Sequence, residues 1–135
     1  MSKRIWTAAA AFVLLCVTGA ILAQSSGLTR TMVTKADVSV PGHEAVVARV
    51  ELAPGTTAGW HTHPGDEISY VTAGELTLMM AGQAPRKVTA GEGFVIPAGT
   101  VHNARNEGTT PVNLIGVYVV EKGKPLASPA PAPGQ

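Results

Sequence analysis

Apolar and polar residues alternate over short segments along most of the chain from Met32 onward, which is the pattern of half-buried β-strands. Six segments show this pattern or are short apolar runs rich in β-branched residues. They are residues 45–52, 68–72, 76–80, 86–89, 94–96 and 112–120. Glycine or proline closely follows each of them, and turn signals recur about every eight to twelve residues. No segment beyond the N-terminal region has a sustained helical period, so the pattern predicts an all-β sandwich or barrel.

The N-terminal region differs because it is continuously apolar. Lys3 and Arg4 precede an almost entirely apolar run over residues 5–23, and a polar stretch ends it. This is the layout of a secretory signal peptide, the one part of the chain expected to be helical. Cleavage after Ala23, or after Ala20, would leave the protein periplasmic or secreted and free of the membrane. An uncleaved membrane anchor is the alternative, since the run nearly reaches the length of a membrane span.

The rest of the chain supports one domain, as expected for 135 residues. We divide the sequence into a signal peptide or anchor (1–23), a polar lead-in (24–31), a β-barrel domain (32–124) and a tail (125–135). Proline alternates with small residues in the tail, which predicts a disordered, extended segment.

Loss of the signal peptide changes both charge and ligand inventory. The chain has 10 basic and 9 acidic residues, a net charge of +1; without Lys3 and Arg4 it has 8 against 9, a net charge of −1. No basic cluster remains, which argues against nucleic acid as a partner. The one cysteine, Cys16, lies in the same segment, so neither a disulfide nor a thiolate ligand is expected in the mature chain. A lipoprotein anchor on Cys16 is disfavoured because Leu15 precedes it.

Three of the four histidines form a pattern with one glutamate. His61 and His63 are two residues apart, so they share a face of a strand but not of a helix. Glu67 follows a Pro-Gly turn, and His102 comes from a later hairpin. Imidazoles with a carboxylate suit iron, manganese, nickel, zinc, copper or cobalt. Four protein ligands fill a tetrahedral site but leave two positions open on an octahedral one. His43, in an expected turn, is interpreted as exposed.

The spacing of these residues resembles the two sequence motifs of the cupin family. The first motif is a glycine, five residues, His-any-His, three or four residues, Glu, six residues and a glycine. It is matched by Gly55, His61, His63, Glu67 and Gly74. The second is a glycine, five residues, proline, one residue, glycine, two residues, His, three residues and asparagine. It is matched by Gly91, Pro97, Gly99, His102 and Asn106.

This resemblance implies a double-stranded β-helix barrel of the cupin or jelly-roll type, with a metal ion inside its mouth. It implies the ligands His61, His63, Glu67 and His102. It also implies that the motif glycines serve turns and that Asn106 hydrogen-bonds a turn. Family members often pair, so a homodimer is expected.

The resemblance leaves the activity open, because one fold supports many functions. It favours a metal-dependent dioxygenase acting on a small organic molecule. The alternatives are a non-catalytic metal- or small-ligand-binding protein, acting as sensor or scavenger, and a metal-dependent isomerase or lyase. No second catalytic acid or base stands out. The expected apolar pocket wall consists of Val47, Val71, Leu78, Met80, Phe94, Ile96 and Leu114.

Overall fold

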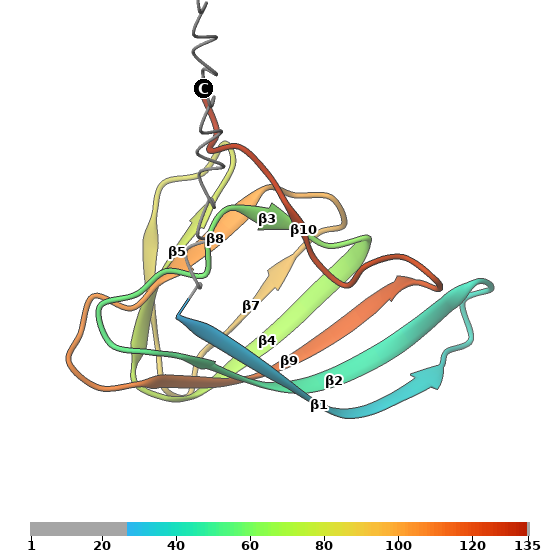
Figure 1. The fold of residues 1–135 in the computed structure, drawn as a ribbon, viewed down its shortest axis with the longest axis horizontal. Coiled ribbons are helices and arrows are strands. Elements are labelled where there is room, and N and C mark those ends of the chain that lie inside the picture. Colours follow the sequence, from blue (N-terminus) through green and yellow to red (C-terminus); the bar gives the residue numbers. More distant parts are fainter. Residues whose placement is uncertain (1–26, 135) are drawn as a thin grey trace, which may run out of the picture.

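The computed structural model describes residues 27–134 and arranges them into ten β-strands with no helix in that range (Figure 1). The strands are β1 (Leu28–Asp37), β2 (His43–Leu52), β3 (His61–Thr62), β4 (Gly65–Ala73), β5 (Glu75–Met80), β6 (Arg86–Thr89), β7 (Gly93–Ile96), β8 (His102–Arg105), β9 (Val112–Glu121) and β10 (Ser128–Pro129). The predicted signal peptide, residues 1–23, lies outside the described residues. Within residues 27–134, no helix is long and apolar enough to span a membrane.

The strands form two five-stranded sheets that face each other. One sheet has the order β1-β2-β9-β4-β7 and the other the order β10-β3-β8-β5-β6. Every pairing is antiparallel, and β2 pairs with β9 along its whole length, from His43 opposite Glu121 to Leu52 opposite Val112. The predicted all-β, double-stranded β-helix fold is confirmed.

Along each central strand, buried residues alternate with more exposed ones, and the buried residues form the core. In β9 every second residue is buried, including Val112, Leu114 and Tyr118, whereas the residues between them are half-buried. Gly116 is part of this inward row, and a Cβ there would lie 2.7 Å from the Tyr118 hydroxyl oxygen. The glycine therefore makes room for the tyrosine ring between the sheets.

Asn106 ties the turn before β9 to the barrel, as the resemblance implied. Its side-chain amide donates to the carbonyls of Leu52 (3.0 Å) and Thr110 (2.8 Å). Its side-chain oxygen accepts from the Gly108 amide at 3.0 Å. The asparagine is completely buried, so it satisfies backbone groups that the turn would otherwise leave unpaired.

The first strand and the tail differ from the sequence-based expectation. β1 begins at Leu28, inside the expected lead-in. The sequence pattern indicates this edge strand only weakly, because its residues are mostly polar. The tail was expected to be disordered, yet Ser128–Pro129 pairs with β3 as strand β10. The Ala130 amide also donates to the Trp60 carbonyl at 2.9 Å. Composition does not reveal this pairing, since an edge strand tolerates proline and its partner lies far away in the sequence.

Candidate metal centre

The structure brings all four predicted ligand residues together at one end of the space between the sheets. His61 lies in β3, opposite His102 at the start of β8. His63 follows β3 directly, and Glu67 lies in β4, two residues after that strand begins. One ligand atom from each residue lies within 4.8 Å of the others, and all but His61 are buried. The cluster could therefore hold a metal ion.

Three backbone carbonyls orient the three imidazole rings. The Nδ1 atoms of His61, His63 and His102 lie 2.7, 2.6 and 2.8 Å from carbonyl oxygens. These oxygens belong to Gly59, Leu126 and Thr100, respectively. A carbonyl only accepts, so each Nδ1 carries the proton and each Nε2 presents a lone pair. Histidine ligands of metal ions characteristically have this outer hydrogen bond.

Glu67 completes the cluster as an ionised carboxylate. Its Oε2 lies 2.9 Å from His63 Nε2 and 3.4 Å from His102 Nε2, and Ser69 Oγ donates to its Oε1 at 2.7 Å. Burial alone would raise the pKa of Glu67. The neighbouring His102 and His63 rings and the Ser69 hydroxyl together outweigh burial and hold the pKa well below its ordinary value.

The Nε2 atoms of His63 and His102 provide the test of whether a metal ion fits. Both are buried and have no hydrogen-bond partner. The 2.9 Å approach of His63 Nε2 to Glu67 is not a hydrogen bond while the ring is neutral, since neither atom then carries a proton. Buried lone pairs that face each other are unfavourable. A divalent cation between them would satisfy these atoms, so the donor set fits a metal ion.

His61 is neutral near pH 7. Burial lowers its pKa to about 4, and the neighbouring His102 and His63 add to the shift, although its hydrogen bond to Gly59 opposes it. A neutral ring is the form that binds metal, so His61 Nε2 can bind an ion without first losing a proton.

A small, mainly apolar cavity adjoins the cluster. Its volume is about 30 Å³. Its lining includes His61, Glu67 and His102. It also includes Leu78, Phe94, Ile96 and Leu114, the four residues of the expected wall that do line it.

The other three residues expected in the wall do not line the cavity. Val47 lies on the outer face of β2, because Val46, Ala48 and Val50 take the inward positions. Val71 is fully buried in the core, and Met80 packs against the core from its edge.

Sequence reasoning missed two polar residues of the cavity, Arg30 and Tyr118. Arg30 falls in the expected lead-in and gave no signal. Tyr118 shares the inward parity of Val112 and Leu114 in β9, so periodicity could have identified it. Burial raises the pKa of Tyr118 to about 12 and Glu67 adds to the rise, so the phenol stays protonated.

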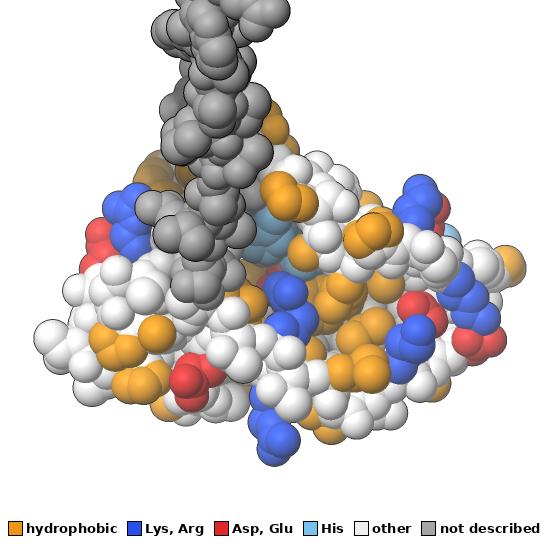
Figure 2. All heavy atoms as spheres, viewed as in Figure 1, with side chains coloured by type: hydrophobic (Ala, Val, Ile, Leu, Met, Phe, Trp, Pro, Cys, Tyr) orange, Lys and Arg blue, Asp and Glu red, His pale blue; other side chains and the backbone are white. Residues whose placement is uncertain are grey.

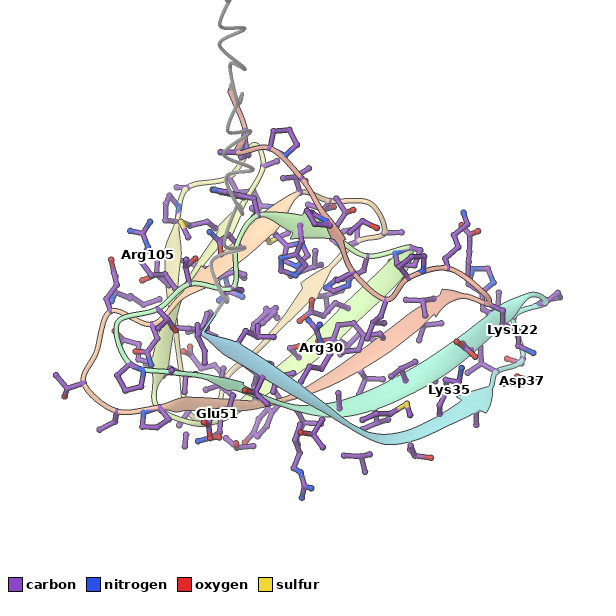
Figure 3. All side chains as sticks on the ribbon, in the orientation of Figure 1. Arg30, Lys35, Asp37, Glu51, Arg105 and Lys122 are labelled. Carbon is purple, nitrogen blue, oxygen red and sulfur yellow. The ribbon has the colours of Figure 1, made fainter. Side chains whose placement is uncertain are left out.

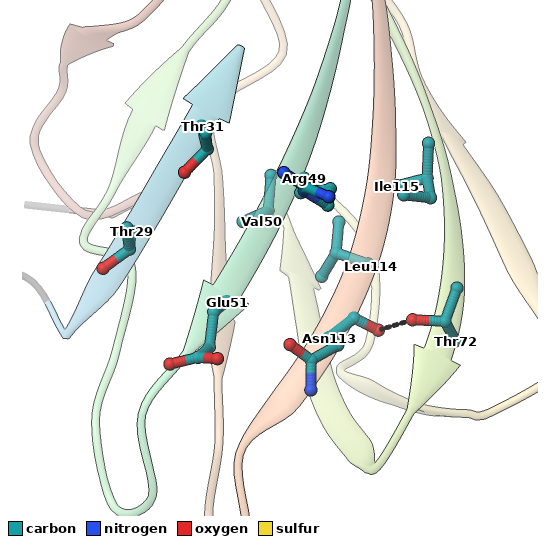
Figure 4. Close-up of a pocket in the computed structure, with 9 residues that line it drawn as sticks. All are labelled: Thr29, Thr31, Arg49, Val50, Glu51, Thr72, Asn113, Leu114 and Ile115. Carbon is teal, nitrogen blue, oxygen red and sulfur yellow. Dashed lines mark hydrogen bonds between the residues drawn. The ribbon is translucent and has the colours of Figure 1, made fainter. Parts of the chain in front are cut away.

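Another hollow lies on the outer face of the first sheet, away from the histidines (Figure 4). Arg49, Glu51 and Asn113 are among its lining residues, and the Thr72 hydroxyl donates to the Asn113 carbonyl at 3.1 Å. Unlike the interior cavity, it is lined by no histidine and no buried charged side chain.

Two facing antiparallel sheets around a buried cluster of three histidines and a glutamate define the class: a small β-barrel protein with a site suited to one metal ion. The chain belongs to the cupin domain family, whose model matches residues 48–120, more than half of the sequence.

Comparison with known proteins agrees with this assignment. Nectarin-1 of Nicotiana langsdorffii x Nicotiana sanderae is 36% identical over 97 residues, covering 65% of this chain and 42% of that protein. The chain thus spans less than half the length of the curated relatives it matches.

Solved structures share the fold. A double-stranded β-helix protein from Klebsiella pneumoniae has a TM-score of 0.62 at 23% identity, covering 77% of this chain and 87% of that one. Oxalate oxidase in complex with the substrate analogue glycolate has a TM-score of 0.61 at 30% identity, covering 76% and 55%.

Proposed function

We propose that this protein binds one divalent metal ion through His61, His63, Glu67 and His102 and is a metal-dependent oxygen-using enzyme, of dioxygenase type, for a small organic molecule. The observation that carries the proposal is the convergence of three unprotonated Nε2 atoms and one ionised carboxylate within 4.8 Å. A bound iron, manganese, nickel, copper, cobalt or zinc ion would supply Lewis-acid chemistry, and a redox-active one electron transfer as well.

The chain's own residues have distinct parts in this proposal. The four ligands hold the ion, and the backbone carbonyls behind the histidines keep the rings aimed at it. Phe94, Ile96 and Leu114 make the wall that limits the size of the bound molecule and excludes bulk water. Exclusion of water strengthens electrostatic interactions at the centre.

The structural similarity to oxalate oxidase supports oxidation of a small molecule. The similarity covers 55% of that protein, so the substrate is not carried over with the fold. The small cavity independently favours a small substrate. We further propose, from residues 1–23, that the protein acts in the periplasm or outside the cell.

A non-catalytic role is the second candidate. Apart from the ligand residues, the cavity lining offers as polar side chains only Arg30 and Tyr118 within the described range. That inventory also suits a protein that captures a metal ion or a small ligand without transforming it.

Metal content and oxygen uptake test the proposal. We expect about one ion per chain by elemental analysis, and metal-dependent oxygen uptake with one of a panel of small hydroxy acids, diketones and catechols. Loss of both histidines in His61→Ala/His102→Ala should abolish both properties. His43→Ala is the matched control, because His43 contacts the Pro41 carbonyl outside the cluster and should leave both unchanged. If elemental analysis finds no metal in the wild-type protein, metal binding is overturned. If the protein contains metal but takes up oxygen with none of the substrates, the non-catalytic role is favoured.

A further inference from the structure

Arg30 is the one basic side chain that lines the interior cavity among the described residues. It belongs to β1, whose exposure alternates only at the start of the strand, and Arg30 is half-buried between the exposed Thr29 and Thr31. Figure 3 shows Arg30 in the space enclosed by the sheets, whereas Arg105 and Lys122 lie at the periphery. Charged side chains seldom line a mainly apolar cavity, so the position of Arg30 calls for an explanation.

Arg30 also stands at the boundary between the interior cavity and an outer groove. The groove is lined by Trp60, Ala127 and Pro129, among others, and Arg30 and His61 line both spaces. Figure 2 shows histidine surface beside a Lys or Arg side chain and hydrophobic side chains on this face of the molecule. A molecule that enters from the groove would therefore meet Arg30 and His61 before it reaches the three buried ligand residues.

Tyr118 holds Arg30 in place. Arg30 Nε donates to the Tyr118 hydroxyl at 3.3 Å, and the guanidinium carbon lies 5.3 Å from the centre of the ring. The Tyr118 ring packs in turn against the His63 ring, with centroids 4.9 Å apart. These contacts position the guanidinium over the Tyr118 ring and connect it, through that ring, to His63.

The charge of Arg30 is not neutralised within residues 27–134. No carboxylate there lies within 4.0 Å of its nitrogens, and its Nη atoms donate to no group in that range. By contrast, Lys35, Lys87 and Lys122 each form an ion pair on the surface. With a divalent ion beside the single carboxylate of Glu67, the interior would carry excess positive charge on both sides of the cavity.

We propose that Arg30 is the specificity-determining residue of the site and that it selects small carboxylate anions, its Nη groups binding the carboxylate while the molecule lies beside the metal ion. This inference rests on the proposed metal site. A planar guanidinium matches the two oxygens of a carboxylate, and the small cavity excludes large anions. In this proposal Arg30 selects ligands by their negative charge, and the apolar wall selects them by their small size.

Calorimetric titration of the full chain loaded with Zn²⁺, which is redox-inert, tests this assignment. Glycolate and oxalate are the anionic probes, and ethylene glycol is the neutral counterpart of glycolate. We expect both Arg30→Gln and Arg30→Leu to bind the two anions at least about tenfold more weakly than wild type. Arg30→Lys keeps the positive charge but not the planar guanidinium, so its loss of affinity for the anions should be intermediate. Ethylene glycol should bind weakly to every form.

Arg49→Gln is the matched control, since it removes an arginine from the exposed outer face of β2 and should bind the anions as wild type does. Zn²⁺ binding alone, measured in each variant, reports whether the barrel and its ligands are intact. Unchanged glycolate affinity in whichever of Arg30→Gln and Arg30→Leu still binds Zn²⁺ would overturn the assignment of Arg30. Equal affinity of wild type for ethylene glycol and glycolate would do so too. Failure of wild type to bind Zn²⁺ would instead remove the proposed site, and this inference with it.

Discussion

At the scale of single residues, the centre depends on groups that do not touch the metal position. Each histidine is oriented through its Nδ1 hydrogen bond, and Glu67 is oriented through the Ser69 hydroxyl. Such outer contacts fix the direction of the ligand lone pairs before an ion binds. They would lower the cost of assembling the site, so their loss is expected to weaken metal binding.

Ser69→Ala should weaken metal binding about tenfold while the barrel stays folded. The substitution removes the 2.7 Å hydrogen bond to Glu67 Oε1, so the buried carboxylate loses its orientation and one stabilising donor. Zinc or manganese titration calorimetry measures the effect. Thr72→Ala is the control, because it removes a hydroxyl hydrogen bond on the outer face of the same strand. Equal affinities in the two variants would contradict the role of Ser69.

The metal-free protein should lose stability as the pH falls from about 6.5 towards 4. In the unfolded chain His61 takes up a proton near 6.5, but in the folded protein its pKa is about 4, so acid favours the unfolded state between these values. The lowered pKa of Glu67 adds a further loss only below about 4.5, where the unfolded chain takes up a proton on this carboxyl before the folded protein does. Metal affinity should fall over the same range because protons compete for the ligands.

Thermal melts of the metal-free protein across this pH range measure the loss. In His61→Gln the part of the slope between about 6.5 and 4 that belongs to this ring should disappear. A melting temperature in wild type that is constant over the range would contradict the assigned neutral state of His61.

At the scale of elements, the C-terminal segment is part of the centre. Strand β10 pairs with β3, placing Ser128 opposite Thr62 and Pro129 opposite His61. The Leu126 carbonyl, just before it, accepts the His63 Nδ1 proton at 2.6 Å. The segment therefore supports two ligands at once, although its composition suggested only a disordered tail.

Truncation after Lys124 should weaken metal binding by about ten- to a hundredfold. It removes the Leu126 carbonyl and β10, while all strands of the first sheet remain. Truncation after Pro131 is the control, because it keeps β10 and the hydrogen bond from Ala130 to Trp60. Calorimetric titration gives the affinities, and circular dichroism checks the strand content. Identical metal affinity of the two truncated chains would show that the segment is dispensable.

At the scale of the whole molecule, the outer face of the first sheet carries an exposed apolar patch. Ile68 and Tyr70 of β4 and Val95 of β7 are 46%, 52% and 57% exposed. Val95 pairs with Ile68, so these side chains adjoin at the β7 edge of the sheet. Adjoining apolar side chains on a surface can mark a site of protein–protein contact. The expected homodimer would cover this one with its symmetric copy.

Ile68→Lys/Val95→Lys should shift the protein from dimer to monomer. The double substitution places two positive charges on the apolar patch of each copy, and these would repel each other across the expected interface. Sedimentation equilibrium measures the mass in solution. Thr109→Lys, in an exposed loop before β9, controls for added charge and should remain dimeric. A wild-type protein that sediments as a monomer would refute the dimer.

Much of the fold was accessible from the sequence because it depends on local patterns. Each of the six segments expected to be strands overlaps a strand of the structure, and the parity of β9 defines the core face. The spacing of His61 and His63 required an extended backbone, and the structure brings both beside Glu67 and His102. β1, β3, β8 and β10 lie outside the six segments. β1 and β10 are edge strands that are polar or very short and depend on partners for their structure.

By itself, the sequence determined the strand periodicity, the turns and the kind of ligand atoms available, since these depend on residues close together in the chain. Only the tertiary structure decided which distant groups act on the centre. Arg30 reaches Tyr118 across 88 positions, and the Leu126 carbonyl reaches His63 across 63. Neither contact has a local signature, because it exists only once the sheets have closed around the cavity.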